Sequence, residues 1–117
     1  MSHYLSQTAP QVLLNAQTAS GTAGILLIEG LCARATVSLT GTGTTSSGVI
    51  TIEEAYYSPS TSPYAGTWSL LANVNASDLT GGVQKVIHVT GSVWALRVRI
   101  STVIGGGGTI TAVAWGN

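Results

Sequence analysis

The chain contains 117 residues, about the size of one domain, and only 7% of them are charged. Its formal net charge is +0 and its four basic residues are spread along the chain, which excludes the basic patch of a nucleic-acid-binding protein. Its longest apolar run, Gly24–Ile28, is far shorter than the about 20 residues of a membrane span, and the N-terminus has no secretory signal pattern. We therefore expect a single domain made in a cytoplasm, with no membrane or nucleic-acid partner.

The N-terminal segment predicts an extended arm, residues 1–12, which precedes one domain, residues 13–117. The arm runs through Pro10 and lacks regular alternation, and such arms become ordered when another surface binds them. Its end overlaps a weak strand candidate at residues 11–16.

Alternation of apolar and polar residues predicts β-strands along most of the remaining chain. In residues 33–41, for example, Val37 and Leu39 share one face while Thr36 and Ser38 share the other. The pattern recurs, clearly or weakly, in residues 47–57, 66–74, 83–89, 92–102 and 108–115. Seven or eight short antiparallel strands, joined by turns rich in Gly, Ser and Thr, predict an all-β domain that is a β-sandwich or jelly roll.

The strand at residues 92–102 should form a central row of the core, because its apolar residues fall on one face. Arg97 and Arg99 then point away from the core. The apolar face consists of Trp94, Leu96, Val98 and Ile100.

Two polar segments predict surface loops. Residues 40–48 are too rich in Thr, Ser and Gly to pack, so they should form an exposed tip. Residues 57–66 contain two Pro and two Tyr, so they should form a long loop that makes contacts.

Glu53 and Glu54 are adjacent in a strand and point to opposite faces, which prevents them from acting together as a catalytic acid and base. Glu53 should face outward. Glu54 lies in phase with the apolar positions of its strand and needs a cationic partner, which Arg34, Arg97 or Arg99 could supply within the chain or from a neighbour. We expect a structural ion pair.

No other group of residues indicates catalysis or metal binding. His3, Cys32 and His88 are separated by tens of residues without a recurrent ligand spacing, and a lone Cys between apolar neighbours favours a buried thiol. Asp78 is most simply a turn or cap residue. We expect no enzyme activity, no metal and no cofactor.

Four consecutive glycines, Gly105–Gly108, follow the strand that contains the two arginines and suggest a phosphate-binding loop. Such loops open directly onto a helix, and the P-loop form ends in Lys followed by Ser or Thr. Here the run leads into the alternating residues 109–115, and no Lys follows. We therefore predict a flexible hairpin connection, which could also lie close against a neighbouring backbone.

The order and spacing of several segments carry more information than any one of them. These segments are ATVSLTGTG, SGVITIE, GTWSLL, GGVQKVIHVTGSVWALRVRIS and GGGGTITAVAWGN. Over about residues 24–117 their succession resembles that of small β-sandwich virion proteins of tailed bacteriophages. The Pro-containing insert at residues 58–65 departs from that pattern.

The resemblance implies a capsid decoration, or cement, protein, often a homotrimer, that is made in the host cytoplasm and lies on the capsid surface of the virion. It would bind the major capsid protein and other copies of itself, and hold the shell against the pressure of packaged DNA. Contacts are then expected from the arm, the loop with two Pro, and an ion pair between subunits. The residues concerned are Ser2, His3, Tyr4 and Leu5 of the arm, Tyr57, Pro59, Pro63 and Tyr64 of the loop, and Arg97 and Arg99 pairing with Glu53 or Glu29.

Two other functions stay open. A tail, neck or fibre module of the same fold could bind host-surface glycan, because aromatic faces stack on sugars and β-sandwiches host such sites. A hydrolase would need His88 or Glu53 in a catalytic role. The aromatic residues available to a glycan are Tyr56, Tyr57, Tyr64 and Trp68.

Overall fold

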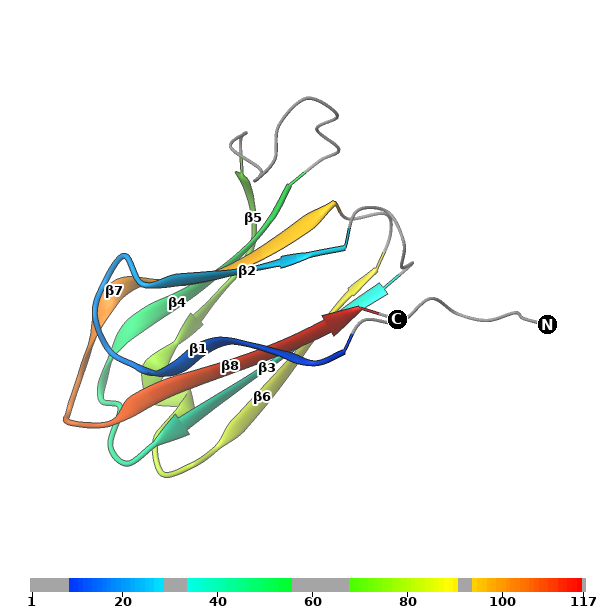
Figure 1. Cartoon of the computed structure of the whole chain (residues 1–117). Coiled ribbons are helices and arrows are strands. Elements are labelled where there is room, and N and C mark those ends of the chain that lie inside the picture. The colour runs from blue at the N-terminus through cyan, green and yellow to red at the C-terminus, as the bar shows by residue number, and fades with distance from the viewer. Residues whose placement is uncertain (1–8, 29–33, 56–67, 91–93, 117) are drawn as a thin grey trace.

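The protein is built from two antiparallel sheets of four strands each, which face each other across one core (Figure 1). The computed structural model describes residues 9–28, 34–55, 68–90 and 94–116. The predicted all-β sandwich is confirmed. In chain order the strands are β1 (Gln11–Gln17), β2 (Ala23–Leu27), β3 (Arg34–Thr42), β4 (Ser47–Ala55), β5 (Trp68–Asn75), β6 (Gln84–Thr90), β7 (Ala95–Gly105) and β8 (Thr109–Gly116), with a 3₁₀ turn, η1 (Ala76–Leu79), before β6.

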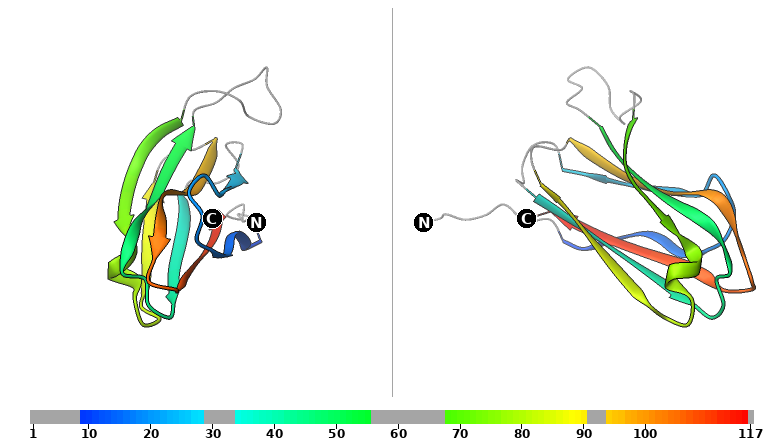
Figure 2. Two further views of the ribbon diagram at one scale, coloured as in Figure 1. Left: turned by 90° about the vertical axis from the view of Figure 1, so that its left-hand side faces the viewer. Right: turned by 180° about the vertical axis from the view of Figure 1, so that it is seen from behind.

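The connections between the strands give the fold its topology. Sheet A has the strand order β1-β8-β3-β6, and sheet B has the order β2-β7-β4-β5. The step from β4 to β5 joins neighbours in sheet B, and every other step crosses from one sheet to the other (Figure 2). Eight antiparallel strands connected in this way form a jelly roll. Because β1 begins at Gln11, the last two residues of the predicted arm belong to sheet A.

β2 is the strand that alternation did not predict. It lies at the edge of sheet B and pairs with β7. Leu26 is fully buried, whereas its neighbours Ile25 and Leu27 are 41% and 43% exposed. The two-residue period therefore exists in the burial of β2 but not in its residue types, because both of its faces carry aliphatic side chains.

The core is filled by aliphatic side chains from the inner faces of both sheets. The central row predicted for β7 is confirmed for Leu96, Val98 and Ile100, which are fully buried, while Trp94 is only half-buried. Burial of each such aliphatic side chain contributes about 1.5–3 kcal/mol. The outward direction predicted for the arginines of β7 follows from the same alternation.

The Gly run joins the two sheets rather than two paired strands. β7 lies in sheet B and β8 in sheet A, so the predicted hairpin is wrong and the run is a crossover. The predicted close approach to another backbone is confirmed, because the Gly108 amide donates to the Thr44 carbonyl oxygen at 2.7 Å and a Cβ on Gly108 would lie 2.6 Å from that oxygen. Gly106 and Gly107 have φ angles of +103° and +91°, a region that favours glycine.

The turn between β3 and β4 is exposed at Gly43, Thr44 and Ser46, as its polar composition predicted, but Thr45 packs inward. Thr45 is 0% exposed. Its Oγ1 donates to the Ala76 carbonyl oxygen at 2.7 Å, and its amide donates to Thr80 Oγ1 at 3.0 Å. These bonds tie the turn to η1. Composition did not predict this because a Thr can be buried wherever the fold supplies hydrogen-bond partners.

Two adjacent leucines of β2 test this account of the core. We expect Leu26→Ala to lower the free energy of unfolding by about 2–5 kcal/mol, because it leaves a cavity between the sheets. Leu27→Ala, the matched control on the outer face, should cost less than about 1 kcal/mol. Urea unfolding measures both, and equal losses for the two variants would contradict the burial pattern of β2.

Candidate functional site

Glu53 and two arginines meet on the outer face of sheet B. β4 lies between β5 and β7. In the register of β4 with β7, Glu53 is directly opposite Arg97, and Arg99 follows two residues along β7 on the same face. Side chains that are opposite or diagonal across antiparallel strands come within reach of one another. Strand pairing therefore brings Glu53 to two arginines that are each more than forty positions away from it in the sequence.

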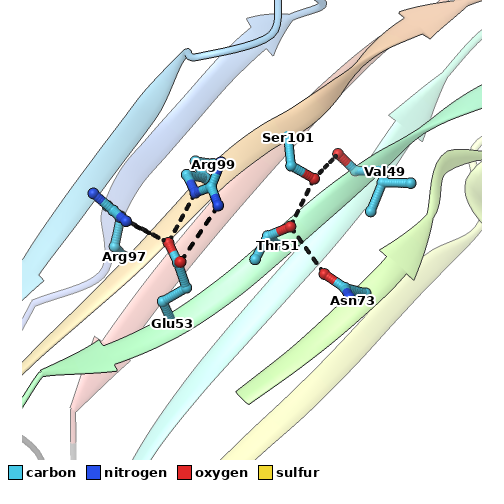
Figure 3. A network of polar contacts seen from close by, with 7 residues as sticks. All are labelled: Val49, Thr51, Glu53, Asn73, Arg97, Arg99 and Ser101. Atoms are coloured by element: carbon cyan, nitrogen blue, oxygen red, sulfur yellow. Dashed lines mark hydrogen bonds and ion pairs between the residues drawn. The ribbon is translucent and has the colours of Figure 1, made fainter. Parts of the chain in front are cut away.

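The Glu53 carboxylate binds both guanidinium groups (Figure 3). Arg97 donates from Nε to Oε1 at 2.8 Å, and its Nη2 lies 2.7 Å from the same oxygen. Arg99 donates from Nε to Oε1 at 2.9 Å and from Nη2 to Oε2 at 3.5 Å. Since Glu53 is only 7% exposed, its charge is compensated by the protein rather than by water. The structure thus contains an ion pair at Glu53.

This ion pair uses a different glutamate from the one expected to need it. Glu54 points to the opposite side of β4, is half-buried, and forms no ion pair with any residue that the structure describes. Because Arg97 and Arg99 point away from the core, only an outward carboxylate can reach them. The ion pair with Glu53 forms within one chain. We had expected these arginines to pair with a glutamate of another subunit, and no second subunit is needed.

The arrangement favours a structural role for Glu53 over a catalytic one. Burial raises the pKa of the Glu53 carboxyl, but the hydrogen bonds and positive charges of Arg99 and Arg97 outweigh this effect, so the pKa lies below its ordinary value of 4.5. An ionised carboxylate held by two arginines is a poor proton acceptor. With two guanidinium groups and one carboxylate, the cluster keeps an excess of positive charge.

Trp68 adds an aromatic ring to this cluster from β5. The guanidinium carbon of Arg97 lies 4.6 Å from the centroid of the Trp68 ring, which is a cation–π contact. Trp68 is half-buried, and Arg97 lies over its ring. Of the aromatic residues considered for glycan binding, Tyr56, Tyr57 and Tyr64 lie outside the described residues.

A chain of hydroxyl groups, which no sequence pattern predicted, continues the polar row on sheet B. Thr51 Oγ1 lies 2.9 Å from Asn73 Oδ1 and 2.7 Å from Ser101 Oγ (Figure 3). Because Asn73 Oδ1 can only accept, Thr51 donates to it and accepts from Ser101. Ser101 Oγ also lies 3.3 Å from the Val49 carbonyl oxygen. These bonds let Thr51 be 96% buried without an unsatisfied hydroxyl.

The outer face of sheet A is different, because it is nearly free of charge. In the register of β8, β3 and β6, Val113, Ser38 and Val86 lie side by side. Ser38 is 8% exposed, whereas Val86 is 44% exposed. Arg34, at the end of β3, is the charged residue on this face among those described. We call it the sheet A face and define it by Thr109, Thr111, Val113 and Trp115 of β8, Thr36, Ser38, Thr40 and Thr42 of β3, and Gln84, Val86, His88 and Thr90 of β6.

The remaining predicted residues fall into two groups. His88 lies on the sheet A face, with its Nδ1 3.4 Å from Thr36 Oγ1, as expected for a sheet histidine with a hydrogen-bond partner. Asp78 lies within η1 rather than at a cap. The others lie outside the described residues, namely Ser2, His3, Tyr4, Leu5, Glu29, Cys32, Tyr57, Pro59, Pro63 and Tyr64.

The described residues hold no group of three or more His, Cys, Asp or Glu side chains that could bind a metal ion. They also contain no helix of the length and apolarity needed to cross a membrane. Comparison of the sequence with known protein families and with curated proteins finds no match. The two outer faces are therefore the features from which a function can be inferred.

Neighbouring glutamates test the ion pair. We expect Glu53→Gln to lower the free energy of unfolding by about 1–3 kcal/mol, because it leaves Arg97 and Arg99 side by side without a carboxylate, although both are partly solvated. Glu54→Gln is the matched control and should cost less than about 0.5 kcal/mol. Equal effects in chemical denaturation would show that the pair does not stabilise the fold.

The pH dependence of stability gives an independent test. Because the pKa of Glu53 is lowered in the folded state, its contribution is complete above the pKa of the unfolded chain and is lost as the pH falls through the folded pKa. The difference in Tm between the wild type and Glu53→Gln should therefore be largest near neutral pH and shrink below pH 4.5. A difference that stays constant down to acid pH would contradict the direction of the shift.

Proposed function

We propose that this chain is a non-enzymatic structural protein of a tailed bacteriophage, a capsid decoration protein that binds the outer shell and stabilises it. The succession of sequence segments that resembles small phage virion proteins supports this proposal. The fold is compatible with it but does not select it, because jelly rolls occur in viral capsid and in lectin domains alike.

The observation that carries the proposal is the scarcity of charge on the sheet A face, where Arg34 at one end is the charged residue among those described. The cores of protein interfaces are depleted in charged residues, because ions lose their hydration when they are covered. On a free monomer, a face with so little charge that displays Val86, 44% exposed, next to Val12 of β1, 59% exposed, would promote association. Such a face suits contact with the major capsid protein, whereas Glu53, Arg97 and Arg99 give the opposite face of the sandwich a charged surface.

The decisive experiment separates virions into heads and tails and locates the protein. The proposal expects the chain to purify with whole virions and then with the heads. Recovery with the tails would show that the protein is a tail or neck component, and absence from virions would overturn the proposal.

A charge at the centre of the sheet A face should prevent attachment. We expect Val113→Lys to reduce the amount of protein bound to heads by at least about ten-fold, because a Lys buried in an interface loses its hydration without a partner. Quantitative gel analysis of sedimented heads measures the effect.

Thr102→Lys is the matched control, because it places the same charge at an exposed position of β7 in sheet B. It should bind heads as the wild type does, and both variants should unfold at similar temperatures. Normal attachment of a folded Val113→Lys protein would exclude the sheet A face as the binding surface.

Glycan binding is the competing function. It would use Trp68 or the tyrosines outside the described residues, and would appear as binding of the isolated protein to host polysaccharide that is lost in Tyr64→Ala. Turnover of a substrate that is abolished by a substitution at His88 or Glu53 would instead indicate an enzyme.

A further inference from the structure

One edge strand of the sandwich, β6, is regular enough to pair with a further strand. β6 is the last strand of sheet A and pairs with β3 (Figure 1). Its register with β3 runs without a shift from Gln84 to Thr90. It contains no Pro, and it carries one charged side chain, Lys85. A regular edge strand of this kind presents a row of unpaired backbone groups.

The other three edges carry features that hinder pairing. β1 has two register shifts against β8, and Ala16 within it has a φ of +51°. β2 spans only five residues. β5 has a shift in its register with β4, where Leu71 is the extra residue. Bulges and short length are the devices by which proteins protect sheet edges, so β6 is the edge left open among the described strands.

The register identifies the backbone groups that face outward from β6. The Gly41 amide donates to the Val83 carbonyl oxygen at 3.5 Å, immediately before the strand. Because bonded pairs alternate along an antiparallel ladder, Lys85, Ile87 and Val89 bond to β3. The residues whose amide and carbonyl groups point to the open edge are therefore Gln84, Val86, His88 and Thr90.

A second copy of the same strand fits this edge. If two β6 strands run antiparallel about a two-fold axis at Ile87, Gln84 faces Thr90 and Val86 faces His88 of the other copy. All four outward residues then form bonded pairs, which gives about eight backbone hydrogen bonds across the junction. Lys85 faces Val89 instead of the other Lys85, so no like charges are opposed. The zero net charge of the chain adds no long-range repulsion.

We propose that β6 pairs with β6 of a second copy, so that two sheets A join into one continuous antiparallel sheet in a two-fold dimer. The junction is isologous, since each strand offers the other the same surface. It also places two sheet A faces side by side. The resemblance to phage proteins implies a trimer, whereas this edge closes as a dimer. The inference does not rest on the proposed function, because it uses the backbone groups of β6 and not the side chains of the sheet A face.

Substitution of Val86 by proline tests the pairing directly. Its amide points to the open edge, and proline is tolerated on an edge strand where the missing N–H faces solvent. Val86→Pro should therefore leave the β3 ladder in place and weaken self-association at least ten-fold, while Val86→Thr, which keeps the amide, should leave it unchanged. Analytical ultracentrifugation of the full chain over a range of concentrations measures the dimer, and circular dichroism checks the fold.

Hydrogen exchange in the wild type gives a second measurement, which does not require a variant to fold. On dilution from dimer to monomer, the amides of Val86 and His88 should lose protection while those of Lys85 and Ile87 keep theirs. A wild type that is monomeric at all concentrations, or a trimer that Val86→Pro leaves intact, would overturn the inference. Failure of capsid attachment would contradict the proposed function but not the dimer. The Val113→Lys variant, for example, should still form the dimer.

Discussion

The structure depends on the burial of two apolar sheet faces against each other by strands that alternate between the sheets. Each crossing step places consecutive strands on opposite sides of the core, so neither sheet can assemble from neighbouring segments alone. This constraint favours aliphatic residues at inward positions, as Leu26, Val37 and Ile100 illustrate. It also sends the polar and charged side chains to the two outer faces, where the differences between the faces can serve function.

The two outer faces use their residues in opposite ways. On sheet B, Arg97 and Arg99 compensate the charge of Glu53 within the chain, and the Trp68 ring lies against Arg97. On sheet A the outward residues are mainly Thr, Ser and Val, and charge is confined to Arg34 at one end among the described residues. A protein with so few charges gains little from long-range electrostatic steering. Its contacts with partners must come from shape, from backbone groups such as those of β6, and from neutral side chains.

Much of the fold could be predicted from the sequence, because alternation reports directly which face of a strand is buried. It identified the inner row of β7 and the outward direction of Arg97 and Arg99. It could not identify β2, where Ile25 and Leu27 are aliphatic on the outer face, because pattern and burial are independent there.

The candidate site was less predictable, because it depends on which strands are neighbours. Alternation showed that Glu53 faces outward, but only the adjacency of β4 and β7 brings it to Arg97. The Gly run suggested a hairpin, since local sequence cannot show that the next strand lies in the other sheet. The hydroxyl chain through Thr51 left no signal, because Thr is common at exposed strand positions as well.

A structure of intact heads by electron cryomicroscopy would test the central claim most directly. The account predicts this domain on the outer shell, with Thr36, Ser38 and Val113 against the capsid subunits and the Glu53 cluster facing away from them. Density for the domain on the tail, or on the head with the sheet A face exposed to solvent, would contradict it.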